Sequence, residues 1–245
     1  MKIAIIPARG GSQRIKNKNI ADFLGKPMIA YALEAAKDSG LFDKIHVSTD
    51  SDTIVSIVEG LGYKVDFKRP QELADSQTGI VPVLKWVIER YAKDGQNYED
   101  ICCIMPAAPL LEPEDLKEAY EIYQQHNKKY PLLVVAKMPV PVEWAFRREK
   151  NGILTPAMPE ALQIRSQDLQ KAYYEAGPFS YFNRSYLLRE RPSADKKFLS
   201  FVIPQERAVD IDDMEDLQLA ETLYRGRLKQ RNEMLNDEKT CNHSG

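Results

Sequence analysis

The feature that most constrains the fold is a regular alternation of short apolar runs with longer amphipathic stretches between Lys2 and Lys137. Ile3–Ile6 and Ile101–Met105 are apolar throughout, as expected for strands that helices cover on both faces. The intervening stretches, such as Pro27–Ser39, carry apolar residues at helical spacing. Strands that alternate with helices are joined by right-handed crossovers. We therefore expect a three-layer α/β fold, with a mostly parallel sheet between two layers of helices.

The same alternation places the remaining elements of this first part. Runs rich in β-branched and aromatic residues predict further strands at Lys44–Ser48, Tyr63–Phe67 and Leu132–Ala136. Amphipathic stretches predict further helices at Asp52–Glu59, Gly79–Tyr91 and Pro113–His126. Helix and strand thus alternate in chain order, which supports the three-layer arrangement.

The alternation stops after about Lys137, and residues 138–181 have a different character. Prolines interrupt this segment repeatedly, helical periodicity is lost, and only short strand-like pieces remain. We interpret it as an insertion or dimerisation arm on a single domain that spans residues 1–235. A charged amphipathic stretch from about Asp213 to Leu235 predicts the last helix, and residues 236–245 are expected to be a disordered tail.

Composition excludes several classes of protein. Lysine and arginine number 34, and aspartate and glutamate 36, so no basic excess indicates nucleic acid or an anionic membrane surface as a partner. No run of about 18 apolar residues predicts a membrane span, and the opening apolar run is too short for a signal peptide. Three cysteines and three scattered histidines fit neither a disulfide framework nor a zinc site. We therefore expect a cytoplasmic protein whose anion binding is local.

A basic loop with two glycines follows the first predicted strand. Its residues with binding potential are Arg9, Gly10, Gly11, Ser12, Arg14, Lys16, Lys18 and Asn19. The glycines let backbone N–H groups approach an anion, and the loop leaves the sheet edge at which α/β proteins bind ligands. The sequence matches neither the P-loop nor the dinucleotide-binding motif. The loop is a candidate triphosphate cradle, and the alternative is a solvated basic turn.

Two carboxylates near the end of the chain form a candidate metal site. Asp210 and Asp212 flank Ile211, and alternate residues of an extended segment point the same way, so both carboxylates would lie on one side. Mg²⁺ is commonly held by one or two carboxylates together with substrate phosphates. Asp212 or Asp213 could instead cap the last helix, and the two roles can coexist.

Other polar segments are less diagnostic. Arg69 lies in a polar loop before a predicted helix, and Asp50 ends the second strand, where it could bind a ligand or cap a helix. Amides, aromatics and Arg165 are dense in the segments 163–169 and 172–179. Such a mixture suits a sugar acid, with the arginine binding a carboxylate. The same residues could equally pack against a partner subunit.

Taken in order, these segments resemble the CMP-sugar-acid synthetases, a cytidylyltransferase family that includes the N-acylneuraminate cytidylyltransferases. The matching motifs, which run from Ile5 to Asp213, are I-I-P-A-R-G-G-S-x-R-I-x-x-K-N, V-S-T-D, R-P-x-E-L-A-D, C-C-I-M-P-A-A-P-L-L and D-I-D. Within the family, the C-C-I and R-S-Q-D-L segments look most like the pseudaminic acid cytidylyltransferases. The resemblance implies a Rossmann-like nucleotide-binding topology of the nucleotide-diphospho-sugar transferase type.

The resemblance also implies a reaction. The anomeric hydroxyl of a nine-carbon 2-keto sugar acid, with pseudaminic acid preferred over other nonulosonic or sialic acids, would attack the α-phosphate of CTP. The products would be the CMP-sugar and pyrophosphate. The cofactor would be Mg²⁺. The residues that match the family's nucleotide site are Arg9, Gly10, Gly11, Ser12, Lys18, Asn19 and Arg69. Asp210 and Asp212 match its metal site, and a looser match places the sugar at Gln163, Arg165, Tyr173 and Phe179.

On this resemblance, Arg9, Lys18 and Asp212 would be the catalytic residues, and the arm would join two chains in a homodimer. Neither nucleic acid nor a membrane is expected as a partner. Two alternatives remain open. The chain could use an eight-carbon or other sugar acid, or it could be a non-catalytic nucleotide-binding module built on the same loop.

Overall fold

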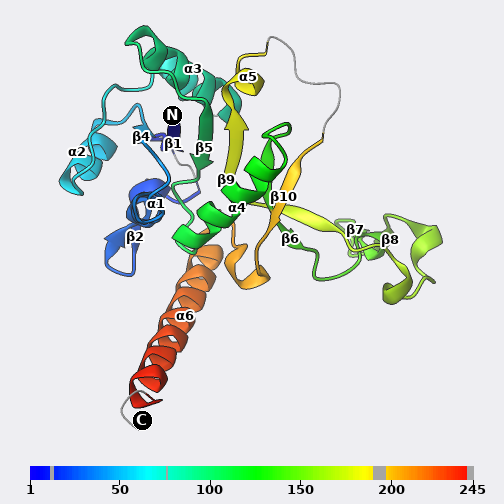
Figure 1. The fold of residues 1–245 in the computed structure, drawn as a ribbon. Helices are drawn as coiled ribbons and strands as arrows, with labels where there is room; N and C mark the ends of the chain where they lie inside the picture. The colour runs from blue at the N-terminus through cyan, green and yellow to red at the C-terminus, as the bar shows by residue number, and fades with distance from the viewer. Residues whose placement is uncertain (12–13, 76, 190–196, 242–245) are drawn as a thin grey trace.

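The computed structural model describes residues 1–11, 14–75, 77–189 and 197–241, and among them the side chains of all but 232 and 234–241. A six-stranded sheet in the order β10-β6-β9-β5-β1-β4 forms its centre (Figure 1). The strands of this sheet are β1 (Lys2–Pro7), β4 (Lys44–Ser48), β5 (Asp100–Ile104), β6 (Leu132–Lys137), β9 (Tyr173–Asn183) and β10 (Leu199–Val202). All the pairs are parallel except those of β9, which is antiparallel to β5 and β6. The prediction of a mostly parallel sheet is confirmed.

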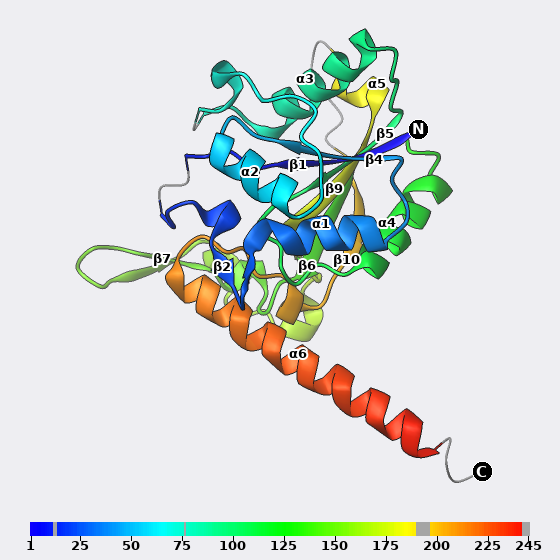
Figure 2. The ribbon, with the colours of Figure 1, turned by 90° about the vertical axis from the view of Figure 1, so that its left-hand side faces the viewer.

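Helices cover both faces of this sheet. These helices are α1 (Met28–Asp38), α2 (Asp52–Gly60), α3 (Ile80–Lys93), α4 (Pro113–Gln125) and α5 (Arg184–Leu187). The last helix, α6 (Met214–Cys241), extends away from the sheet (Figure 2). Helices α1, α2 and α4 lie on one face of the sheet, and α3 and α5 lie on the other (Figure 2). Most buried side chains of these two groups of helices belong to two separate core clusters. All five residues of β5 are buried, because this strand lies between the two helix layers.

The reversed strand β9 follows from the path of the arm. The chain leaves the sheet at the end of β6, passes through the arm and comes back to the sheet at the same end (Figure 1). A strand that starts from that end must run against β6 and β5. Gly177 adopts a φ of +68°, and the pairing of β6 with β9 shifts register between Leu133 and Val135. This bulge lies where β9 passes from β6 to β5.

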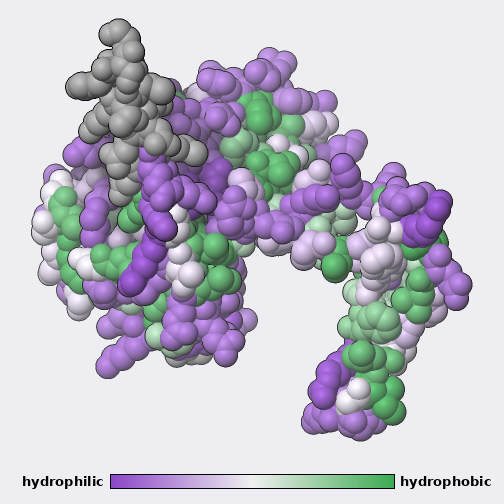
Figure 3. Space-filling view, turned by 90° about the horizontal axis from the view of Figure 1, so that it is seen from below, coloured by the Kyte–Doolittle hydropathy of each residue, from purple (hydrophilic) through white to green (hydrophobic). Residues whose placement is uncertain are grey.

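The arm carries its own two-stranded ribbon, formed by β7 (Phe146–Arg148) and β8 (Leu154–Pro156). It extends away from the main sheet, and apolar residues gather along its surface (Figure 3). The large apolar side chains that the arm exposes are Val140, Val142, Phe146, Ile153, Leu154, Met158, Leu162, Ile164 and Tyr173.

Two predictions about secondary structure are wrong. Tyr63–Phe67 is not a strand: Tyr63 and Val65 pack on one core cluster and Phe67 on the other, so the alternation serves packing without sheet pairing. The segment from residue 236 is not disordered as far as Cys241, because α6 continues to that residue. Its residues are mostly compatible with a helix, and neither glycine nor proline interrupts them. Residues 242–245 lie outside the described part of the chain. In that described part, no helix combines the length and the apolarity needed to cross a bilayer.

A buried histidine lies on β4. His46 is 0% exposed, its Nδ1 lies 3.0 Å from the hydroxyl of Tyr91, and its ring packs on Phe67. Burial, opposed by Asp66 and aided by Lys44, lowers the pKa of His46 from 6.5 to about 3. The unfolded chain therefore binds a proton below pH 6.5 that the folded chain does not accept until about pH 3.

We expect this histidine to make the fold acid-sensitive. The free energy of unfolding should fall by about 1.4 kcal/mol for each pH unit below 6.5, until the pH nears the folded-state pKa. His46→Gln should flatten this slope in urea titrations between pH 6.5 and 4.5, whereas the same change at exposed His126 should keep it. Equal slopes in wild type and His46→Gln would contradict the prediction.

Candidate active site

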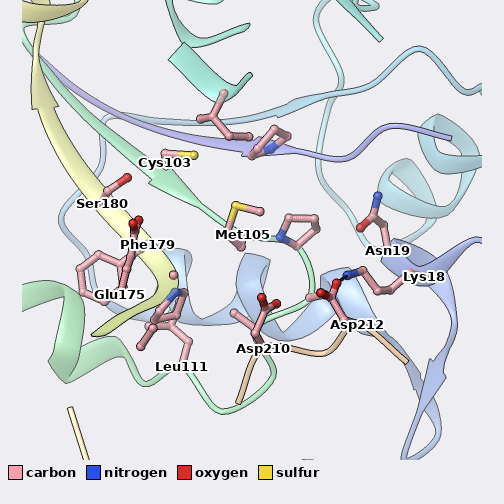
Figure 4. Close-up of a pocket in the computed structure, with 18 of the residues that line it drawn as sticks. Lys18, Asn19, Cys103, Met105, Leu111, Glu175, Phe179, Ser180, Asp210 and Asp212 are labelled. Atoms are coloured by element: carbon pink, nitrogen blue, oxygen red, sulfur yellow. Dashed lines mark hydrogen bonds and ion pairs between the residues drawn. The ribbon is translucent and has the colours of Figure 1, made fainter. Parts of the chain in front are cut away.

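A cavity of about 710 Å³ opens at the carboxyl ends of the parallel strands (Figure 4). Pro7 of β1, Cys103 of β5 and Phe179 of β9 all line it, together with the loops that follow β1 and β5. Ligands of open α/β sheets bind at this edge, because the loops there can diverge and helix N-termini point toward it. The cavity is therefore the candidate site.

The loop after β1 is held in place from three sides. Arg9 Nη1 donates to the carbonyl of Asp75 at 2.8 Å, and Asn19 Nδ2 donates to the carbonyl of Arg9 at 2.9 Å. The N–H of Gly10 donates to Asp50 Oδ1 at 3.0 Å. A Cβ at Gly10 would lie 3.0 Å from Cβ of Ser51, a tighter contact than side chains usually make, so glycine favours the close approach.

These contacts assign roles that the sequence left open. Asp50 positions the loop through Gly10, and Arg9 and Asn19 line the cavity. Neither Gly10 nor Gly11 lines it, and Gly11 is exposed with nothing near its missing Cβ. Ser12 lies outside the described residues.

The other cations of the loop separate into two groups. Lys18 Nζ donates to the carbonyl of Ile211 at 2.5 Å and lies 3.2 Å from Asp212 Oδ1. Arg14 Nη1 lies 2.8 Å from Asp212 Oδ2. Lys16, in contrast, is exposed and does not line the cavity. The basic loop and the late carboxylates, which are far apart in the sequence, therefore meet at the cavity.

Asp210 and Asp212 both line the cavity, and Ile211 between them is fully buried, as the alternation predicts. Burial and the nearby Asp212 raise the pKa of Asp210. Asp210 makes no hydrogen bond or ion pair within the described part of the chain. Of the two candidate caps, Asp213 and not Asp212 caps α6. Its Oδ1 accepts hydrogen bonds from the N–H groups of Glu215 at 2.9 Å and Asp216 at 3.1 Å.

This pair fits a divalent cation that substrate phosphates complete. Both carboxylates line one cavity, and a divalent cation held there would offset the charge of Asp210, whose pKa burial and Asp212 raise. No group of three or more His, Cys, Asp or Glu side chains suited to a metal occurs among the described residues. A closed protein site is therefore absent from that part, and Mg²⁺, which accepts few protein ligands, matches the donor set.

Arg69 is a buried cation without a carboxylate partner among the described residues. It is 6% exposed and lines the cavity. Its Nη2 and Nε donate to the carbonyl and hydroxyl oxygens of Ser48, at 2.5 and 3.1 Å. Burial lowers the pKa of this guanidinium. A buried, unpaired guanidinium at a cavity wall is suited to a ligand that presents acceptor oxygens or ring nitrogens.

The far end of the cavity contains a charged group that sequence reasoning missed. Arg207 lines the cavity, and its side chain is 14% exposed. Its Nη1 lies 3.2 Å from Glu112 Oε2 and also contacts the carboxylate of Asp115. Arg227 of α6 binds Glu112 in turn and donates to the carbonyl of Leu110 at 3.2 Å. No sequence motif marks this group, because its members come from three separate elements.

Of the residues matched to the sugar, Phe179 lines the cavity, whereas Gln163, Arg165 and Tyr173 lie on the arm outside it. Arg165 is exposed, and its Nε lies 2.9 Å from Asp168 Oδ2. Tyr173 begins β9 and pairs with Lys137. Their assignment to the sugar stays a prediction, and within one chain only Phe179 is in place for it.

Comparison with known proteins decides the family. The family model described as cytidylyltransferase matches residues 3–239. The chain belongs to the cytidylyltransferase family. It is 40% identical over 224 residues to the pseudaminic acid cytidylyltransferase of Campylobacter jejuni subsp. jejuni serotype O:23/36, covering 91% of this chain and 96% of that protein.

More distant cytidylyltransferases also match nearly the whole of this chain. The N-acylneuraminate cytidylyltransferase of Escherichia coli O18:K1:H7 is 28% identical over 230 residues, covering 94% of this chain and 53% of that protein. The solved structure of a CMP:2-keto-3-deoxy-manno-octonic acid synthetase complexed with CTP superposes with a TM-score of 0.70 and 16% identity, covering 92% and 99% of the two chains. This last likeness shows a shared fold.

Proposed function

We propose that the chain transfers CMP from CTP to the anomeric hydroxyl of a nonulosonic acid, with pseudaminic acid preferred, and releases pyrophosphate. One observation carries the proposal: Lys18 and Arg14 of the loop after β1 form ion pairs with Asp212 at the cavity that Asp210 also lines. Such a site can bind a triphosphate together with a divalent cation. The names of the relatives supply the acceptor class.

The residues of the site divide the work of phosphoryl-type transfer, which asks mainly for positioning and charge neutralisation. Arg9, Arg14 and Lys18 would neutralise the triphosphate, and Arg69 would bind acceptor atoms of the base. Asp210 and Asp212 would hold Mg²⁺, which supplies charge neutralisation at the α-phosphate. Asp212 would also be one candidate to accept the proton of the attacking hydroxyl.

Release of pyrophosphate tests the function. The protein is incubated with CTP, Mg²⁺ and a panel that holds pseudaminic acid, N-acetylneuraminic acid and an eight-carbon 2-keto sugar acid. We expect release with a nonulosonic acid, fastest with pseudaminic acid. Release with the eight-carbon acid alone would favour the second substrate class. CTP binding by calorimetry without release on any acid would indicate a non-catalytic module and would overturn the proposal.

We also propose that the arm joins two chains in a homodimer. Phe146 of β7 and Leu154 of β8 are 50% and 56% exposed, and Ile153, which precedes β8, is 57% exposed. Apolar surface gathered on a projecting ribbon is costly in water unless a second surface covers it. A second copy is the occupant that fits the position of the arm, because the same face is available on every chain.

Leu154→Asp should convert the dimer to a monomer in sedimentation at micromolar concentration, because the aspartate would be buried unpaired in the interface. The equivalent change at Leu228, an exposed leucine of α6, should leave the dimer intact. A wild-type protein that sediments as a monomer would contradict the proposal.

The cytoplasm is the compartment we propose. CTP is supplied there, and Cys102 and Cys103 are both free and buried in the sheet. Free thiols are the usual state of cysteine in a reducing compartment.

A further inference from the structure

The cations that line the cavity occupy different parts of it. Arg9, Arg14 and Lys18 belong to the loop after β1, and Arg69 contacts Ser48 at the end of β4. β1 and β4 are neighbours at one edge of the sheet. The remaining cation, Arg207, has no contact with this group.

Arg207 is fixed at the opposite edge of the sheet. It ends the short helix Gln205–Arg207 that follows β10. Ile203 N donates to the carbonyl of Val135 at 2.9 Å, and Gln205 Nε2 donates to the carbonyl of Lys137 at 2.7 Å, so this segment is attached along β6. β6 and β10 are separated from β1 by β9 and β5.

From Arg207 the chain crosses the cavity toward the basic loop. Asp210 follows after three residues, which span about 10 Å if extended. Ile211 then packs in the cluster that contains Ile15. Asp212 reaches Lys18. The order across the cavity is thus Arg207, then the paired carboxylates, then the cations of the loop.

This order matches the covalent order of the two substrates. In a 2-keto sugar acid the carboxylate is bonded to the anomeric carbon, whose hydroxyl attacks the α-phosphate. The triphosphate therefore extends from the reacting centre in one direction, and the carboxylate lies beside that centre on the other. The cations of the loop would bind the triphosphate. A different cation, on the β6 side of the cavity, would then be required to bind the carboxylate.

We propose that Arg207 binds the carboxylate of the sugar acid; the assignment rests on the proposed function. Glu112 and Asp115 both contact Nη1 of Arg207, whereas Nε and Nη2 have no partner within the described part of the chain. These two N–H groups form a fork that suits a carboxylate. Arg227 balances the charge of the second carboxylate. The group of two arginines and two acids therefore carries no net charge that would repel the ligand.

The surroundings strengthen such a contact. Leu133, Phe179 and Ile203 line the cavity together with Glu175 of β9, and Phe179 and Ile203 are buried. A charge-assisted hydrogen bond is stronger where apolar side chains limit access of water. The anchoring of Arg207 through Glu112 also gives α6 a role, because Arg227 fixes the orientation of that glutamate.

The test compares a sugar acid with its C1 carboxamide. The probe is the nonulosonic acid with the fastest pyrophosphate release in the panel, and kcat/KM is measured for both forms with wild type and with Arg207→Gln. We expect wild type to prefer the acid by roughly 10- to 150-fold, the size of a charge-assisted hydrogen-bond pair. The variant should lose most of this preference and keep its KM for CTP. Exposed Arg225 of α6 offers a matched control, and Arg225→Gln should keep the wild-type preference.

The other possible results would contradict either the assignment of Arg207 or the proposed function. A variant that prefers the acid as strongly as wild type overturns the assignment, as does loss of the preference in Arg165→Gln instead. Absence of release by wild type with every acid would overturn the proposed function itself, a separate result. If Arg207→Gln does not fold, as judged by its thermal midpoint, Arg207→Lys is used. The ammonium group retains a charge for Glu112 but not the fork, so the preference should fall about tenfold, and an unchanged preference contradicts the assignment.

Discussion

Asp212→Ala is expected to lower kcat/KM for CMP-sugar formation by about 10³-fold, the largest effect predicted for a single change. The variant loses one of two carboxylates that line the cavity and the ion-pair partner of Lys18. The fold should tolerate the change, because the ion pair of Asp212 with Arg14 is largely exposed and such pairs contribute little to stability. Initial rates of pyrophosphate release and a thermal midpoint measure the two quantities.

The adjacent carboxylate supplies a matched control. Asp213 is exposed and caps α6 through two backbone N–H groups. Asp213→Ala should therefore reduce the stability by about 1 kcal/mol and leave the rate close to that of wild type. Equal losses of rate in the two variants, or unfolding of Asp212→Ala, would show that Asp212 acts through the structure of the segment and not through the reaction.

Lys18→Ala is expected to lower kcat/KM for CTP by about 10²-fold or more. Its ammonium group is partly buried and is held at the cavity by the carbonyl of Ile211. On the proposed function, a fixed cation at this position would stabilise the charge that develops on the leaving pyrophosphate. The loss should appear in kcat as well as in KM, which steady-state kinetics with CTP as the varied substrate separates.

Lys16 lies two residues away and offers the comparison. Its side chain is exposed and lies outside the cavity, so Lys16→Ala should cost far less than Lys18→Ala. Raised salt should reduce the small effect of Lys16 further, since exposed charges are screened. A loss at Lys16 as large as that at Lys18 would mean that the loop binds the triphosphate with its outer face.

Several features of this protein could be predicted from the sequence because short-range periodicity controls them. The apolar run before Pro7, the helical spacing after Pro27 and the alternation around Ile211 each depend on residues that lie close together in the chain. The structure confirms the strand, the helix and the burial of Ile211. The family likewise follows from motifs whose order survives in the sequence, and the family comparison confirms it.

Tertiary structure alone decided which polar groups meet. Arg207 contacts acids that lie 95 and 92 residues earlier, and Lys18 meets Asp212 across 194 residues. No local pattern encodes such contacts, because they depend on where β6, β9 and β1 lie in the sheet. The same reason explains why Arg165 is outside the cavity of its own chain: the arm that carries it leaves the sheet at the end of β6 and returns there as the reversed strand β9.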